Sequence, residues 1–260
     1  MPWLRSAVAC VLVAACGESA GPPSDGGTID VAPRPSQGGS VFVTASAYTV
    51  QEKVFAETRV GAQFTTDASC TDVVEGACVT RRCSGTPTER SAGPITVQGL
   101  TGGDEVLAGA PYPTRTSATQ RFLGGETLGA TFAGDAVPGA TRSVVAPDFV
   151  TLTLPSWAPS ATLSIPRSSD LVLTWDGGNR GTAFVELSDG AVSVRCEAKA
   201  TSAKMSVPAK LLAPLAKAST FQFGTVARDA RDVGAWRVDF VVTALASRGG
   251  AVAAGPVSID

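Results

Sequence analysis

From Val41 onward, apolar and polar residues alternate with a period of two, and turn-forming residues interrupt the alternation at short intervals. Successive side chains of a β-strand point to opposite faces, so this pattern is typical of half-buried strands. It predicts strands over residues 41–50, 58–65, 78–83, 94–99, 126–133, 148–154, 171–176, 182–188, 191–199, 220–228, 235–245 and 251–259. We therefore expect an all-β protein with an antiparallel β-sandwich architecture.

Turns and one helix punctuate these strands. The clearest turns are residues 176–179 (DGGN) and 188–190 (SDG), whose Gly and Asn residues tolerate positive φ. One segment, residues 208–215 (PAKLLAPL), breaks the alternation. A proline in the first turn and a second proline that ends the run predict a helix of one or two turns. We expect its leucines to plug the end of a sandwich rather than to bind a partner.

The N-terminus has a different character from the rest of the chain. Arg5 precedes a short apolar run, and Val13-Ala14-Ala15 leads directly to Cys16. This order resembles the signal peptide of a bacterial lipoprotein, residues 1–15, whose lipobox ends at the lipidated cysteine. The resemblance implies cleavage before Cys16 by signal peptidase II and acylation of Cys16. The run is much shorter than the roughly 20 residues that span a bilayer.

Two neighbouring residues bear on this anchor. Cys10 also follows small residues, but too few apolar residues precede it to form the hydrophobic segment of a signal peptide. Cys16 is therefore the preferred lipidation site. Gly17, and not Asp, follows Cys16, which by the resemblance favours the outer membrane over the inner membrane. The membrane partner is thus expected to be reached through lipid alone, and two or more acyl chains hold stably.

Residues 17–40 are rich in Gly, Pro and Ser and contain almost nothing that could be buried. With Cys16 they are expected to form a lipidated, disordered tether over residues 16–40. Such a flexible chain has an r.m.s. span of roughly 25–30 Å. The folded part is predicted as two lobes, an N-terminal β lobe over 41–158 and a C-terminal immunoglobulin-like β-sandwich over 159–260.

Two resemblances concern the folded part. The strands and turns of the second lobe are similar to immunoglobulin-like or fibronectin-like modules in general terms only. Trp175 precedes Cys196, the only cysteine of this lobe, so the antibody pattern of a tryptophan between two bridged cysteines of one domain is absent. Residues 122–128 (FLGGETL) and 170–175 (DLVLTW), with the cysteine-rich first half, resemble uncharacterised lipoproteins of myxobacteria and related predatory soil bacteria. This second resemblance brings no catalytic motif with it.

Four cysteines remain beyond the anchor: Cys70, Cys78, Cys83 and Cys196. In an exported protein an even set predicts disulfides, here two. Because Gly76 lies in a predicted turn, the first choice is Cys70–Cys78 with Cys83–Cys196, and the second is Cys70–Cys83 with Cys78–Cys196. The spacing C-x7-C-x4-C, in a chain without histidine, is a poor match to zinc sites, so no metal site is predicted.

Composition excludes several classes of function. The chain has no histidine, which excludes Ser-His-Asp and Cys-His hydrolases and His-ligated metal centres. The formal net charge is −2 and no block of like charge occurs, so nucleic acid is not an expected partner. No cofactor motif is present. We therefore expect a lipid-anchored envelope protein that acts as a non-catalytic binding or structural module, with an envelope or extracellular protein or a glycan as its partner.

Two alternatives remain open. The first is a carbohydrate-binding or calcium-assisted adhesin, in which exposed aromatics would stack on sugars and loop Asp and Asn residues would supply oxygen ligands. The aromatic residues are Trp157, Trp175, Trp236, Phe184 and Tyr112, and the loop residues are Asp170, Asp176, Asn179, Asp229 and Asp232. The second is a histidine-independent, glycosidase-like hydrolase, which requires two carboxyl groups about 5–10 Å apart in an open cleft.

Overall fold

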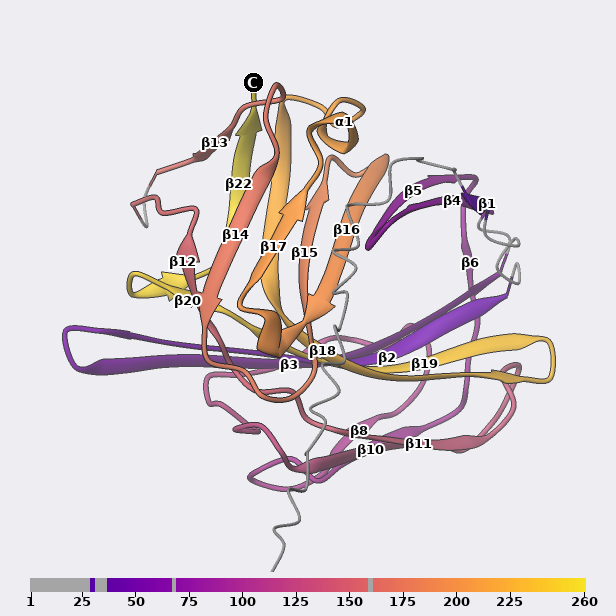
Figure 1. Ribbon diagram of the computed structural model, residues 1–260. Coiled ribbons are helices and arrows are strands. Elements are labelled where there is room, and N and C mark those ends of the chain that lie inside the picture. The colour runs from indigo at the N-terminus through magenta and orange to yellow at the C-terminus, as the bar shows by residue number, and fades with distance from the viewer. Residues whose placement is uncertain (1–28, 31–36, 67–68, 159–160) are drawn as a thin grey trace, which may run out of the picture.

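The computed structural model describes residues 29–30, 37–66, 69–158 and 161–260 (Figure 1). Cys16, the predicted signal peptide and most of the predicted tether lie outside them. The described part is built of strands, with a short helix α1 (Ala209–Leu212) and a 3-10 turn (Ala200–Ser202). This confirms the prediction of an all-β sandwich fold. None of the described helical segments has the length and hydropathy to cross a membrane.

A 13-stranded sheet runs through both halves of the molecule. Its main path has the order β1-β4-β5-β16-β15-β18-β19-β2-β3-β6, with β9 beside β3 and with β22 joining β13 to β18. Its strands are β1 (Ile29–Asp30), β2 (Gly38–Val50), β3 (Lys53–Thr66), β4 (Ser69–Glu75), β5 (Cys78–Ser84), β6 (Thr88–Glu89), β9 (Arg115–Ser117), β13 (Leu163–Ile165), β15 (Thr182–Ser188), β16 (Val192–Lys199), β18 (Ala218–Val233), β19 (Trp236–Leu245) and β22 (Ala254–Ile259).

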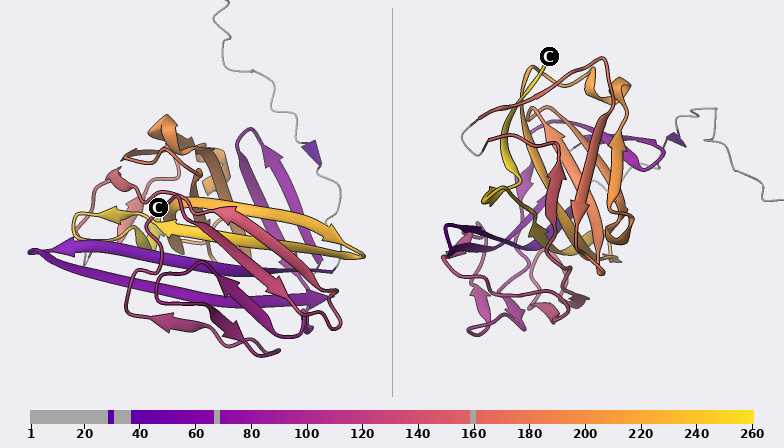
Figure 2. Two further views of the ribbon diagram at one scale, coloured as in Figure 1. Left: turned by 90° about the horizontal axis from the view of Figure 1, so that it is seen from below. Right: turned by 60° about the vertical axis from the view of Figure 1, so that its left-hand side comes forward.

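Two smaller sheets each cover part of this large sheet. The four-stranded sheet has the order β11-β10-β7-β8, and the five-stranded sheet has the order β17-β14-β12-β20-β21. The result is two sandwiches that share the large sheet (Figure 1, Figure 2). The strands are β7 (Ile95–Gln98), β8 (Glu105–Leu107), β10 (Thr127–Phe132), β11 (Ala140–Val145), β12 (Thr151–Leu154), β14 (Leu171–Asp176), β17 (Lys204–Val207), β20 (Ser247–Arg248) and β21 (Ala251–Val252).

Each sandwich encloses its own hydrophobic core. Alternation places Leu171, Leu173 and Trp175 of β14 in the core beneath the five-stranded sheet. The other core is completed by Phe240 and Val242 of β19, which lie far along the chain from its remaining members. The cores therefore divide the chain differently from the predicted lobes 41–158 and 159–260. The reason is that β19 pairs in parallel with β2, and periodicity gives no information about such a distant pairing.

β18 connects the two sandwiches. Its first part pairs with β22 and its second part, from Gly224, pairs with β19. A Cβ atom at Gly224 would lie 2.3 Å from the carbonyl oxygen of Ala244. Only glycine permits this close approach, so Gly224 allows β18 to change partners within one strand.

β2 and β3 form a long hairpin that projects from one side of the molecule (Figure 1, Figure 2). Its two-residue turn is formed by Gln51 and Glu52, whose φ angles are 46° and 67°. Two positive φ angles are typical of a type I′ turn, which usually contains Asn and Gly. The predicted strands end at residue 50 and resume at residue 58, whereas β3 begins at Lys53, directly after this turn, which lacks Asn and Gly.

The disulfides are Cys70–Cys83, between β4 and β5, and Cys78–Cys196, between β5 and β16. The first of the two predicted connectivities is thus wrong and the second is found. The β4–β5 hairpin does turn near Gly76, but its register places Cys78 opposite Glu75 and Cys70 opposite Cys83. Cys78 is then opposite Cys196 on the next strand, so this disulfide joins the cysteine cluster to the C-terminal sandwich.

The helix α1 is shorter than the predicted 208–215, but its role is as expected. Leu211, Leu212 and Leu215 are all buried in the core of the C-terminal sandwich, which confirms that they plug its end. Asp170 Oδ1 accepts a hydrogen bond of 2.9 Å from the backbone N–H of Ala209 at the start of the helix. This bond satisfies one of the free N–H groups of the first helical turn.

Candidate functional site

The three tryptophans that the adhesin alternative requires do not come together on an exposed face. Trp175 and Trp236 are buried in different cores, and Trp175 Nε1 donates a 2.8 Å hydrogen bond to the carbonyl oxygen of Ala200. Trp157 is half-buried, with the guanidinium of Arg248 3.7 Å from its ring centroid. These side chains serve packing, as strand-borne aromatics usually do.

The two other aromatics of that platform are also structural. Phe184 is buried, and the guanidinium of Arg195 lies 4.1 Å from its ring centroid. The hydroxyl of Tyr112 accepts a hydrogen bond from the N–H of Ala92 and donates one to the carbonyl oxygen of Gly93. These five residues therefore do not form the sugar-binding platform that the adhesin alternative requires.

Three of the aspartates considered as calcium ligands have other partners, and Asp176 is exposed at the end of β14. Asp170 caps α1, Asp229 pairs with Arg231 at 3.1 Å, and Asp232 pairs with Arg237 at 3.4 Å. Across the described ranges, no group of three or more His, Cys, Asp or Glu side chains is arranged to hold a metal ion. The three partnered aspartates act in capping and ion pairing in the structure.

A groove of about 740 Å³ lies over the β2–β3 hairpin, and we call it the hairpin groove. Alternation along the hairpin explains how it forms. One face of β2 and β3 is buried in the N-terminal core through residues such as Val43 and Val60, and the other face forms the groove floor. The groove is lined by Phe42, Thr44, Ser46, Tyr48, Val54, Phe55, Ala56, Glu57, Arg59, Ala118, Gln222, Leu245, Val252 and Ala254.

An aromatic pair occupies the end of the groove near the hairpin tip. Tyr48 and Phe55 lie directly opposite each other on β2 and β3, and their rings stack with centroids 5.3 Å apart and an interplanar angle of 13°. Phe55 is 45% exposed, although phenylalanine is usually buried. With Tyr48 half-buried and Phe55 exposed, this pair forms an aromatic surface that is partly open to solvent.

Polar side chains follow the aromatic pair along the groove. Arg59 Nε donates a hydrogen bond to Glu57, and Gln222 of β18 also lines the groove. The ring of Phe42 covers Gly61, where a Cβ atom would lie 2.4 Å from the ring. The groove therefore offers a flat apolar surface beside a carboxylate, a guanidinium and an amide.

The sequence contained one signal for this site. Residues 54–56 are three consecutive apolar residues, which do not alternate and so did not fit a half-buried strand. In the structure they lie on a strand that is exposed on both faces near the hairpin tip. Consecutive apolar residues beside a projecting turn thus indicated an exposed apolar surface.

A second hollow is lined by charges of both signs. It consists of two adjoining cavities of about 390 and 400 Å³ that share Ser40, Arg81 and Asp239, and we call it the charged cleft. Arg81 forms two hydrogen bonds, of 2.7 and 2.6 Å, with the carboxylate of Asp72. The hydrogen bond from Arg81 to Asp72 raises the pKa of the Arg81 guanidinium, against the opposing effect of burial.

The two glutamates of the charged cleft share one arginine. Arg195 donates to Glu186 at 2.9 Å and to Glu197 at 2.8 Å, and Arg228 donates to Glu197 at 2.7 Å. The hydrolase alternative requires a pair of carboxyl groups in a cleft, and Glu186 and Glu197 are two glutamates that line this one. Each of these carboxylates accepts a hydrogen bond from a guanidinium, so both take part in ion pairs. Their geometry is that of an ion-pair network that ties β15, β16 and β18 together.

Comparison with known proteins assigns no function to the hairpin groove or the charged cleft. No protein-family model and no curated protein matches the chain.

Proposed function

We propose that this protein is a non-catalytic binding module of the bacterial cell envelope, held to the membrane by lipid at Cys16. The ligand would bind in the hairpin groove. The observation that supports this most directly is the stacked Tyr48–Phe55 pair at the end of a groove about 740 Å³ in volume, where Phe55 is exposed and Tyr48 is half-buried. Ligand sites of this size typically combine apolar surface with a few polar groups.

The chemistry of the groove favours a glycan among the partners expected from the sequence. The C–H face of a sugar ring can stack on a flat aromatic surface such as that of Tyr48 and Phe55. Sugar hydroxyls both donate and accept hydrogen bonds, and Glu57, Arg59 and Gln222 together supply donors and acceptors. We therefore propose a polysaccharide of the envelope or the extracellular matrix as the ligand.

Co-sedimentation with purified peptidoglycan sacculi and with insoluble neutral polysaccharides tests this proposal. The protein is used as the Cys16→Ser chain, so that lipid does not cause sedimentation. We expect Tyr48→Ala and Arg59→Ala to lower the bound fraction on at least one glycan by about tenfold, as loss of a central contact commonly costs over 1 kcal/mol.

Leu123→Ala is the matched control, because Leu123 is 70% exposed but does not line the groove. It should bind as the parent chain does. Circular dichroism would show that all variants remain folded. Equal binding by Tyr48→Ala, Arg59→Ala and the parent, or no binding to any of the glycans, would contradict the proposal.

A further inference from the structure

β3 has one free edge close to the hairpin tip. On one side it pairs with β2 from Lys53 to Thr65. On the other side β9 pairs only with Thr58, Arg59 and Val60, and β6 pairs only with Thr65 and Thr66. Within the part of the chain that the structure describes, residues 53–57 have no strand on this second edge. Their outward N–H and C=O groups are available to another strand.

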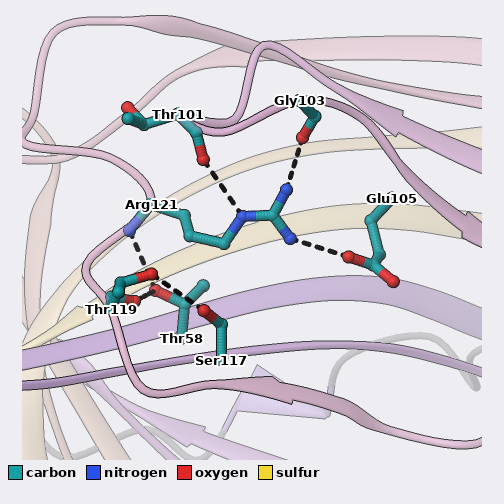
Figure 3. Close-up of polar contacts among 7 residues, drawn as sticks. All are labelled: Thr58, Thr101, Gly103, Glu105, Ser117, Thr119 and Arg121. Carbon is teal, nitrogen blue, oxygen red and sulfur yellow. Dashed lines mark hydrogen bonds and ion pairs between the residues drawn. The ribbon is translucent and has the colours of Figure 1, made fainter.

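Side-chain contacts fix the point at which this edge becomes free. The hydroxyl of Thr58 donates to the carbonyl oxygen of Thr119 at 2.8 Å and accepts from the N–H of Arg121 at 3.0 Å (Figure 3). The Arg121 guanidinium in turn donates to Glu105 at 2.7 Å and to the carbonyl oxygens of Thr101 and Gly103. These bonds direct the chain away from β3 after Ser117, and they leave the edge beyond Thr58 open.

The free edge carries unusual side chains. Val54 is 69% exposed and Phe55 is 45% exposed, one on each face of the strand. Proteins generally protect sheet edges with charges, proline or bulges, because an apolar edge invites another strand to pair. Here charges occur only at the two ends of the segment, as Lys53 and Glu57.

The segment Lys53-Val54-Phe55-Ala56-Glu57 is complementary to itself. If two copies pair antiparallel about a two-fold axis at Phe55, residue 53 of each copy lies opposite residue 57 of the other. Both cross-strand pairs then join Lys53 of one copy to Glu57 of the second copy. Val54 lies opposite Ala56, and Phe55 lies opposite its own counterpart. Opposite charges and aromatic pairs at directly opposed positions stabilise antiparallel strands.

We propose that two copies of this chain associate through the free edge of β3, residues 53–57, as a two-fold symmetric dimer. The hairpins then form one continuous antiparallel sheet in the order β2-β3-β3-β2. Because Tyr48 lies opposite Phe55 within each copy, four aromatic rings line up across the four strands. The two hairpin grooves thereby share a single aromatic floor.

A second copy fits this edge better than an unrelated strand does. An unrelated strand could pair through the backbone groups. Its sequence would not in general place a negative charge opposite Lys53 and a positive charge opposite Glu57, as a second copy does. A five-residue strand pair buries less than the roughly 1,000 Å² of a stable interface, so the dimer is weak in dilute solution. Anchoring many copies on one membrane would raise their local concentration.

Sedimentation equilibrium of the Cys16→Ser chain over micromolar to millimolar concentrations tests the dimer. Lys53→Glu places a second carboxylate opposite Glu57 of the other copy, so two attractions become two repulsions. We expect the dissociation constant to rise by about tenfold or more. Glu57→Lys should have a similar effect. The double variant Lys53→Glu/Glu57→Lys should dimerise as the parent does, and a mixture of the two single variants should form a heterodimer.

Lys204→Glu is the matched control, since Lys204 is exposed on β17 and the change alters the net charge by the same amount. It should leave the dissociation constant unchanged. A parent chain that stays monomeric at millimolar concentration would overturn the proposal, and so would a dimer that Lys53→Glu does not weaken. Lys53 does not line the hairpin groove, so the Lys53→Glu variant should still bind glycan as a monomer. The proposal of glycan binding and the proposal of dimerisation are therefore tested separately.

Discussion

Asp189 illustrates how one carboxylate organises two distant segments. Its Oδ1 accepts hydrogen bonds from the N–H groups of Ala191 at 2.9 Å and Val192 at 2.8 Å, and its Oδ2 accepts one from Ala216 at 2.9 Å. Hydrogen bonds from the backbone of Val192 and then Ala216 hold the pKa of Asp189 below its ordinary value. The turn at 188–190 was predicted from its residue types. The bond to Ala216 was not, because it depends on how the sheet is assembled.

Replacing Asp189 by alanine should destabilise the protein by about 1 kcal/mol at neutral pH, because it removes these hydrogen bonds. Since the pKa of Asp189 is lowered on folding, its contribution is present above the ordinary pKa of 3.8 and is lost as pH falls through the lower value. The difference in unfolding free energy between parent and variant should therefore shrink in acid, as urea denaturation at several pH values would measure. Asp104→Ala, at an exposed position, is the control. A difference that does not change with pH would refute this role.

The aromatic residues show which assignments a sequence can support. Trp175 and Phe184 lie on strands that alternation predicted, and both are buried as such positions usually are. Tyr48 was on a predicted strand, but the sequence did not indicate that its partner would be Phe55. That pairing depends on a turn formed by Gln51 and Glu52, residue types that rarely adopt positive φ. The candidate site was therefore missed because its turn is unusual.

At the scale of single elements, prediction succeeded where burial and flanking turns agree. β14 and β15 have the predicted bounds, 171–176 and 182–188. β18 was predicted over 220–228 but extends over Ala218–Val233. Its last part carries charged residues such as Arg228 and Asp232, and it is held as a strand by pairing with β19. Sequence patterns detect burial, and this part of β18 is stabilised by hydrogen bonds with little burial.

The two disulfides should contribute unequally to stability. Cys78–Cys196 joins residues 118 apart in sequence, whereas Cys70–Cys83 joins residues 13 apart. Chain-entropy estimates give about 5 kcal/mol for the long loop and about 3 kcal/mol for the short one. Replacing both cysteines of Cys78–Cys196 by serine should therefore lower the unfolding free energy more than the same change in Cys70–Cys83.

Chemical denaturation of the two double variants measures this difference. Peptide mapping of the parent chain under non-reducing conditions provides the control, and it should recover Cys78 linked to Cys196. Recovery of Cys83 linked to Cys196, or an equal loss of stability in the two variants, would show that this account of the bridges is wrong.

At the scale of the whole molecule, two sandwiches share one large sheet. The sequence predicted two β lobes, but it could not indicate that β19 would pair with β2. Sheet order depends on contacts between residues far apart in the chain, and alternation reports only which face of a strand is buried. The shared sheet also positions the hairpin groove, whose floor comes from β2 and β3 and whose lining includes residues of β18, β19, β21 and β22.

The proposed lipid anchor at Cys16 concerns the whole molecule, because it would hold the protein, and with it the hairpin groove, at the membrane surface. Replacing Cys16 by serine should abolish incorporation of labelled palmitate and release the protein from the membrane fraction, since the diacylglyceryl group is attached to the thiol. Cys10→Ser should leave both properties unchanged. Continued labelling of Cys16→Ser would show that another residue carries the lipid or that the chain is not a lipoprotein.

The most direct test of the account is to locate the bound glycan on the protein. Soluble fragments released from purified sacculi, or from whichever polysaccharide binds, would be titrated into the isotope-labelled Cys16→Ser chain and followed by nuclear magnetic resonance. We predict that the largest shift changes fall on Tyr48, Phe55 and Gln222 in the hairpin groove. Changes confined to the charged cleft around Glu186 and Arg195, or no changes at millimolar glycan, would contradict the account.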